Sequence, residues 1–316
     1  MKKRLLIYVC ILLFFEIKGQ ENEIYFINAP TGLIIRDLPS LNSNRIGKLP
    51  YGSIVELLEE TEFKQRIIDN NDTINGIWLK IKYNNYPFIV SESESEYGYE
   101  QEGYVFSGYA EKLNKAQIKT KELDSLQFYN LFTEPKPYKH TTIKSEEEAK
   151  KLLASNVKWK TIEHLGNVIS EINLNTGQTL HINQKSNDYW FVAYYPLEQI
   201  ILFEGGHSSD YSISLKTGES LKTVGNPEYI IESPNKKLRL NGWFPGQECS
   251  SYFFQEKLED NYRYLAKFGW GGINGENVCY FNKFCWVSNS EFVYSYTDYS
   301  KSIEVEKYVI GNIVIK

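Results

Sequence analysis

Short apolar runs bounded by turn residues make up most of the chain. Strand-like runs fall at residues 33–35, 54–58, 76–81 and 103–105, and turns such as Pro39-Ser40 separate them. β-Branched and aromatic residues in runs of this length are typical of strands, and clusters of Gly, Pro, Asn and Ser are typical of turns. The pattern therefore predicts an all-β chain built from antiparallel hairpins.

One segment has the pattern of a helix instead. Ser145 and Glu148 are spaced as a capping box, in which the serine caps the helix and the glutamate reaches back. Glu146 and Lys150 stand four residues apart, a spacing that supports an ion pair on a helix surface. We expect one short helix, in a linker of residues 113–155 that connects two domains.

Hairpin-like motifs recur in the second half of the chain. Residues 172–180 match residues 213–221 position for position, each as a strand, a Thr-Gly turn and a returning strand. A second strand–turn–strand motif recurs at residues 195–202, 233–240 and, more loosely, 286–294. These repeats predict a repetitive antiparallel β-meander.

The repeats resemble the units of β-propellers of the WD-repeat or TolB type. Their spacing of about 41 residues suits one four-stranded blade, and residues 156–316 have room for roughly four such units. Four blades make the smallest closed propeller. The resemblance implies a small β-propeller for this β-repeat domain, and an open meander is the alternative.

The order of elements in the first part of the chain resembles a bacterial SH3 domain. The resemblance rests on the strand that runs into Arg36 and its turn, on residues 76–81 and on residues 103–105, closing at Tyr109. It covers residues 24–112. The family is a small β-barrel that exported bacterial proteins carry as a binding or spacing module.

Two polar insertions depart from that family pattern within the domain, which we place at residues 20–112. One is Phe63 to Asn75, and the other is Ser91 to Glu102, where Ser and Glu alternate. Alternating Ser and Glu cannot bury apolar surface, so we expect a solvated loop from Ser91 to Glu102, and we interpret the segment from Phe63 to Asn75 as polar in the same way.

The resemblance implies a ligand surface in this SH3-like domain. By analogy with aromatic-lined grooves it would use Arg36, Trp78, Tyr104 and Tyr109 to bind a peptide, a peptidoglycan fragment or an envelope protein. The alternative for each residue is structural. Trp78 and Tyr104 occupy strand positions that a small barrel needs for its core, and Arg36 is placed to brace its turn.

The first nineteen residues have the composition of a signal peptide. Residues 1–4 are basic, residues 5–15 are apolar, and Gly19 is a small residue at the expected cleavage position. The sequence predicts export to the periplasm, the cell surface or the medium; an uncleaved anchor is the alternative. No later segment is apolar enough for a membrane helix, so we expect no membrane span in the mature chain.

Charge narrows the range of partners. The chain has 35 Lys and Arg against 40 Asp and Glu, a net charge of −5. Nucleic acids and anionic membrane surfaces favour clustered Lys and Arg, so neither is expected as a partner. No motif indicates a cofactor, and no feature of the sequence indicates an oligomeric state.

Three cysteines follow the predicted leader: Cys249, Cys279 and Cys285. An exported compartment permits disulfides, and an odd number leaves one thiol over. Either Cys279 pairs with Cys285, or one of them pairs with Cys249, and the sequence does not choose. No His or Cys lies at metal-ligand spacing nearby, so no metal site is expected.

Catalytic motifs matter because bacterial SH3 domains are often fused to cell-wall hydrolases. Residues 248–251, Glu-Cys-Ser-Ser, resemble the Asp-Cys-Ser-Gly motif of NlpC-type cysteine peptidases, whose histidine base lies downstream of the cysteine. Here every histidine lies upstream: His140, His164, His181 and His207. The run from Gly205 to Asp210 holds His, Ser and Asp, but triad members come from separate elements, so it is interpreted as a turn.

The sequence therefore predicts an exported, non-catalytic binding or scaffolding protein. The competing hypothesis is an envelope hydrolase with carboxylate chemistry in the second domain. That chemistry requires two carboxylates facing one cleft, about 5 to 10 Å apart.

Overall fold

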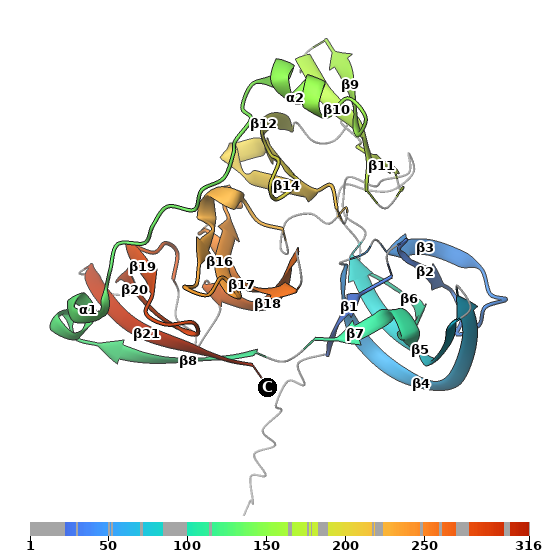
Figure 1. The fold of residues 1–316 in the computed structure, drawn as a ribbon, viewed down its shortest axis with the longest axis horizontal. Coiled ribbons are helices and arrows are strands. Elements are labelled where there is room, and N and C mark those ends of the chain that lie inside the picture. The colour runs from blue at the N-terminus through green and yellow to red at the C-terminus, as the bar shows by residue number, and fades with distance from the viewer. Residues whose placement is uncertain are drawn as a thin grey trace, which may run out of the picture.

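The computed structural model of the chain is all-β, with 59% strand and 10% helix, which confirms the predicted fold class (Figure 1). The predicted leader, residues 1–19, and most of the predicted loop from Ser91 to Glu102 lie outside the described residues. The structure describes residues 23–29, 31–49, 51, 53–69, 72–84, 100–113, 116–163, 166–175, 177, 179–182, 189–216, 218, 224–246, 249–258, 261–269, 278–299 and 304–315.

The N-terminal part is a seven-stranded antiparallel sheet with the order β3-β2-β6-β5-β4-β1-β7. Its ends are β3 and β7, so the sheet stays open among the described residues, and the closed barrel that we predicted is not formed. Its strands are β1 (Ile24–Ile27), β2 (Leu33–Arg36), β3 (Arg45–Leu49), β4 (Ile54–Asp69), β5 (Asp72–Asn84), β6 (Glu100–Phe106) and β7 (Ala110–Lys112).

The hairpin β4–β5 is much longer than the other hairpins of this sheet, and it contains the predicted polar loop from Phe63 to Asn75. That prediction was wrong, because these residues form paired strands, with Ile67 opposite Ile74. The end of β4 is exposed on both faces, so it lacks the apolar alternation by which a strand is recognised. Register shifts along β4 bend the hairpin, as β-bulges do.

Four further antiparallel sheets follow one another along the chain, which confirms the predicted meander. The first two are β9 (Val157–Ile162), β10 (Gly166–Asn173) and β11 (Thr179–His181), then β12 (Trp190–Tyr195), β13 (Ile200–Glu204) and β14 (Asp210–Ser214). The third is β15 (Ile231–Glu232), β16 (Leu238–Trp243), β17 (Ser251–Leu258) and β18 (Asn261–Gly269). The fourth is β19 (Lys283–Trp286), β20 (Glu291–Asp298), β21 (Val305–Ile315) and β8 (Ala116–Leu123).

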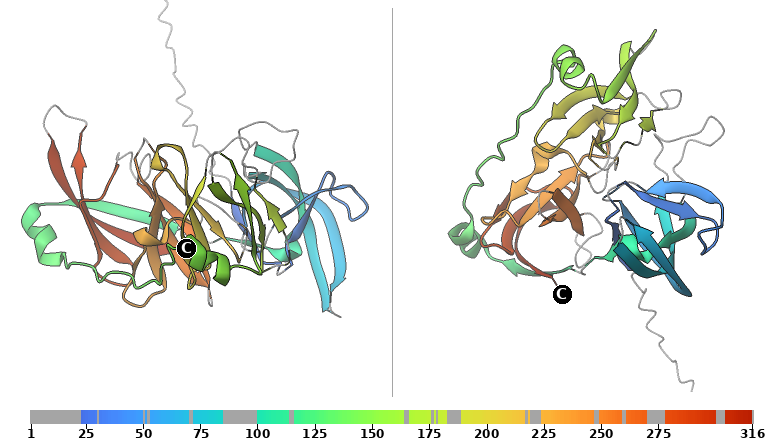
Figure 2. Two further views of the ribbon diagram at one scale, coloured as in Figure 1. Left: turned by 90° about the horizontal axis from the view of Figure 1, so that it is seen from above. Right: turned by 45° about the vertical axis from the view of Figure 1, so that its right-hand side comes forward.

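These four sheets stand in a row from the top to the lower left of Figure 1. The first and last sheets lie at opposite ends of the row, there and in the right-hand view of Figure 2, so the figures do not show the ring of a closed propeller. The sheets pack in pairs, because one buried cluster joins the first two sheets and a second cluster joins the last two.

The second repeated motif forms a hairpin in each of its three copies. The second motif turns between β12 and β13, between β15 and β16, and between β19 and β20. In the first motif Gly177 and Gly218 both adopt a positive φ, +80° and +75°. Glycine adopts this conformation without the steric cost that a Cβ brings, which accounts for a glycine at this position in both copies.

The predicted linker of residues 113–155 is more than a connector. Its strand β8 pairs along its whole length with β21 near the other end of the described chain, from Ala116 opposite Ile315 to Leu123 opposite Tyr308. The sequence did not indicate this pairing, because the partner of β8 lies far away in sequence.

Two α-helices are described, one more than predicted: α1 (Ser125–Leu131) and α2 (Glu146–Leu152). At α2 the Ser145 hydroxyl accepts a hydrogen bond from the Glu148 amide, and Lys150 pairs with Glu146 at 2.5 Å, as the sequence indicated. The unpredicted α1 begins with a complete capping box between Asp124 and Gln127. None of the described helices is long and apolar enough to cross a membrane.

Contacts with β18 hold the N-terminal sheet against the row of sheets. The Arg263 guanidinium lies 2.7 Å from Glu256 of β17 and 3.4 Å from Glu111 of β7. It also lies 5.9 Å from the centre of the Phe26 ring of β1. The Arg263 side chain is only 5% exposed at the junction of the two parts, whereas its partner Glu111 is 50% exposed.

Candidate binding face of the N-terminal sheet

Strand pairing places the predicted ligand residues of β2, β5 and β6 on one face of the N-terminal sheet. Arg36 of β2 lies opposite Tyr104 of β6, Tyr104 lies opposite Lys80 of β5, and Trp78 lies opposite Phe106. Side chains directly opposite each other in a sheet project from the same face. We call the face that carries Arg36, Trp78, Lys80, Tyr104 and Phe106 the outer face.

The other face of the sheet forms the main core. Leu33 and Ile35 of β2, Leu79 of β5 and Val105 of β6 are buried together there. Gly103 lets β6 approach β2 closely, because a Cβ at this position would stand 2.4 Å from Ile35 Cγ2. This packing fixes the strands on which the outer face is built.

Trp78 packs inside the structure and is only 2% exposed. Its ring lies edge-on to Phe106 at 6.3 Å between centroids, and Phe106 lies 6.2 Å from the ring of Tyr109. Trp78 and Tyr109 are thus brought together through Phe106. In this arrangement the indole supports the sheet and offers no ring face to a ligand, which is the structural role considered above.

Tyr109 is half-buried and reaches the long hairpin. Its hydroxyl donates a hydrogen bond to the Asp69 carboxylate at the end of β4. Burial, together with this hydrogen bond, raises the pKa of Tyr109 to about 12. The residue therefore ties the hairpin β4–β5 to the body of the sheet.

Arg36 braces the loop between β2 and β3. It is 7% exposed, and its Nη1 donates a hydrogen bond to the Ser43 carbonyl at 2.6 Å. The Asp37 carboxylate accepts from both the backbone and the side-chain nitrogen of Asn44, at 3.0 and 2.7 Å. The Ser43 hydroxyl donates to the Leu38 carbonyl at 2.8 Å. These bonds hold residues 37–44 in one conformation.

The accessible part of the outer face is formed by Tyr104 and Lys80, which are both half-buried. Lys80 Nζ lies 2.6 Å from Glu102, and this hydrogen bond raises the lysine pKa. Of the four predicted ligand residues, Tyr104 and Tyr109 thus keep part of their rings at the surface, whereas Arg36 and Trp78 are buried.

Sequence reasoning missed the exposed apolar residues that adjoin this face. Leu38 is 60% exposed and Leu41 is 38% exposed in the braced loop, and Ile46 is 46% exposed on β3. A signal was present in the sequence, because Leu38 and Leu41 stand among turn-forming residues where strand packing does not require them.

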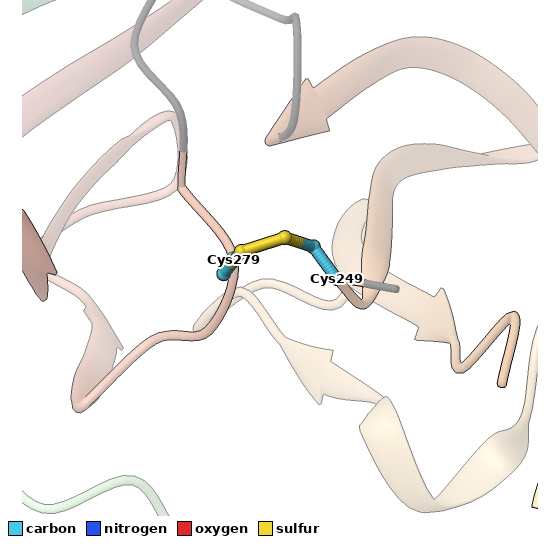
Figure 3. The surroundings of a disulfide bond; sticks show 2 residues. All are labelled: Cys249 and Cys279. Atoms are coloured by element: carbon cyan, nitrogen blue, oxygen red, sulfur yellow. A yellow bond between two sulfur atoms is a disulfide. The ribbon is translucent and has the colours of Figure 1, made fainter. Parts of the chain in front are cut away.

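The cysteines leave no thiol for a peptidase mechanism in the described residues. Cys249 is joined to Cys279 by a disulfide (Figure 3). Cys285 is free but buried, and its sulfur accepts a hydrogen bond from the Thr133 amide at 3.4 Å. Burial raises the pKa of the Cys285 thiol, which disfavours the reactive thiolate.

The loop from Gly205 to Asp210 is a turn, as we interpreted it. Gly206–Ser208 forms one turn of 3-10 helix, and the Asp210 carboxylate accepts a hydrogen bond from the Phe244 amide at 2.9 Å. Burial raises the pKa of Asp210. This carboxylate links the second and third sheets.

One buried carboxylate, Glu198, lies near Glu232 in the described part of the chain. Both carboxylate oxygens of Glu198 are buried, and the neighbouring side chain is the Tyr138 phenol. Its neighbour Tyr138 lies close enough for burial and the Glu198 carboxylate to raise the tyrosine pKa. Glu232, in the same cluster, is already engaged by Lys236 and Tyr262. No group of residues suited to holding a metal occurs in the ranges given above.

No protein-family model, curated protein or solved structure matches this chain. Function therefore has to be inferred from the geometry of the outer face and its surroundings. The likeness to bacterial SH3 domains stays a prediction.

Proposed function

We propose that this chain is an exported, non-catalytic binding protein whose SH3-like N-terminal sheet docks an extended peptide or cell-wall fragment on its outer face. The proposal is supported by one arrangement. Tyr104 and Lys80 lie in a cross-strand row with Arg36, beside a braced loop that presents Leu38 and Leu41 to solvent. Exposed apolar groups on a rigid support are typical of binding surfaces, and rigidity lowers the entropy lost on binding.

Other observations agree with the non-catalytic part of the proposal. Cys249 is held in a disulfide, and the Asp210 carboxylate accepts a hydrogen bond from the Phe244 amide. The composition of residues 1–19 supports export, which places the protein where peptides and wall fragments are available.

Retention on isolated peptidoglycan sacculi, followed by a panel of extended peptides, tests the proposal with the chain of residues 20–316. We expect Tyr104→Ala to weaken capture by about tenfold, since aromatic residues dominate many interfaces. Tyr299→Ala, at a position 65% exposed and outside the N-terminal sheet, is the matched control and should bind normally.

Equal capture by wild type and Tyr104→Ala would remove the outer face from the binding site. Capture of neither sacculi nor peptides by the wild type would overturn the proposal. The hydrolase hypothesis makes a different prediction for the same experiment, because soluble wall fragments would accumulate in the supernatant.

A further inference from the structure

The strand β3 is an end of the N-terminal sheet. Among the described residues it pairs only with β2. Four of its five residues, Arg45 to Lys48, are exposed. The outward backbone N–H and C=O groups of an exposed end strand form a template on which another extended chain can pair.

Two cations flank the outer face along this strand. Arg45 lies opposite Arg36 and Lys48 lies opposite Ile34, so both project from the side of the sheet that carries Tyr104. Neither cation has an ion-pair partner among the residues that the structure describes. Because the whole chain has a net charge of −5, this edge is locally basic on an acidic protein. Such an edge attracts an acidic partner and repels a basic one.

The edge also offers an apolar contact. Ile46 is the extra residue of a β-bulge, between the pairs Ile35–Gly47 and Arg36–Arg45, and it is 46% exposed. Next to it, the braced loop presents Leu38 at 60% exposure. A partner strand that alternates acidic and apolar side chains would therefore meet a cation on one face and an apolar group on the other.

We propose that β3 takes up an extended acidic peptide as an added strand of the N-terminal sheet, with its carboxylates paired to Arg45 and Lys48. This inference rests on the proposed function and names the chemistry of the ligand. The backbone of the peptide supplies the pairing, and its acidic side chains supply the selectivity.

Charged residues on end strands also have a protective use, because they prevent sheets from associating edge to edge. Under that role Arg45 and Lys48 would keep β3 unpaired, and an acidic peptide would not bind there. The two roles therefore make opposite predictions for the binding of an acidic peptide to β3.

Fluorescence anisotropy with a labelled peptide of alternating Glu and Val tests the inference, on the chain of residues 20–316. We expect binding that weakens with added salt, and we expect no binding of the matched Lys-Val peptide. The double variant R45E/K48E should lose affinity by about tenfold or more, because two attractions become repulsions. K119E/K121E, which makes the same charge change at exposed positions on the end strand β8, should bind like the wild type.

A second probe separates strand pairing from simple charge attraction. N-Methylation of alternate residues of the Glu-Val peptide removes backbone N–H donors and leaves its charge unchanged. We expect it to abolish binding. Equal binding of the methylated peptide, or equal competition by the anionic polysaccharide polygalacturonate, would overturn the added-strand inference.

Failure of the inference and failure of the proposed function are distinguishable. If R45E/K48E leaves capture of sacculi unchanged and the Glu-Val peptide does not bind, the outer face still binds but β3 is only a protected edge. If neither sacculi nor any peptide is captured, the proposed function fails as well.

Discussion

Trp78 is 2% exposed and packs edge-on against Phe106, while Thr61 Oγ1 donates a hydrogen bond to the Trp78 carbonyl. Residue type and strand position do not show whether a tryptophan of a small sheet faces a ligand or a second layer of packing. Here packing decides the matter, because the indole lies against the Phe106 ring and is buried in the structure. Tyr104, two residues from Phe106 along β6, stays accessible.

Truncation of Trp78 tests this assignment. We expect Trp78→Ala to lower the free energy of unfolding by about 3 to 5 kcal/mol, since it removes a buried aromatic side chain and leaves a cavity. Urea denaturation followed by circular dichroism measures the change. The control Trp190→Ala, at a position 41% exposed, should cost much less. Equal small losses for both variants would mean that Trp78 is not part of a core.

Distance in the folded chain determines which cysteines form the disulfide. The sequence left three pairings open, and Cys249 and Cys279 come to a Cα–Cα separation of 4.4 Å. Cys285 lies instead in a small cluster with Phe128 of α1 and Val293 of β20. Pairing depends on which segments meet, and sequence spacing alone carries no such information.

Strands were predictable where they bury one face and difficult where they do not. The repeated hairpins followed from apolar runs and turn residues, because strands such as β13, β16 and β20 are buried over four or five consecutive residues. The tip of β4–β5 has no buried face, and α1 is only seven residues long, too short for a clear apolar periodicity. Strand β8 alternates half-buried and exposed residues over most of its length, but its pairing partner β21 lies almost two hundred positions later, near the end of the described chain.

The pairing of β8 with β21 leads to a prediction about the stability of the last sheet. Ile313 of β21 is 4% exposed and lies opposite Ile118 of β8, whereas Ile315 of the same strand is 43% exposed. We expect Ile313→Ala to destabilise the protein by about 2 to 5 kcal/mol and Ile315→Ala by less than about 1 kcal/mol. Urea denaturation of both variants measures the difference. Similar values for the two would contradict a fourth sheet completed by β8.

The two parts of the molecule meet around Arg263, whose side chain is 5% exposed between Glu256 and Glu111. A charge in such a place is tolerated because its partners lie within ion-pair distance and desolvation is offset by their attraction. The junction fixes how the outer face is presented relative to the row of sheets. We expect this contact to couple the unfolding of the two parts.

Removal of the guanidinium tests this coupling. We expect Arg263→Met to cost roughly 3 kcal/mol, because it leaves the largely buried Glu256 carboxylate without its partner. We expect the wild type to unfold in a single calorimetric transition and Arg263→Met to unfold in two. Lys307→Met, which breaks a pair with the exposed Glu122, should cost less than about 1 kcal/mol and keep one transition. One transition in both variants would show that Arg263 does not couple the parts.

The amino-acid sequence by itself determined the all-β class, the repeated hairpins and the helix at Ser145, because these depend on local patterns of apolar, turn and capping residues. It also predicted Arg36 and Tyr104 as residues of one site. Only the tertiary structure decided that Trp78 is buried, that Cys249 pairs with Cys279, that β8 completes the last sheet and that β3 is left as an open edge. Each of these depends on which distant segments meet, and that is settled by packing of the whole chain.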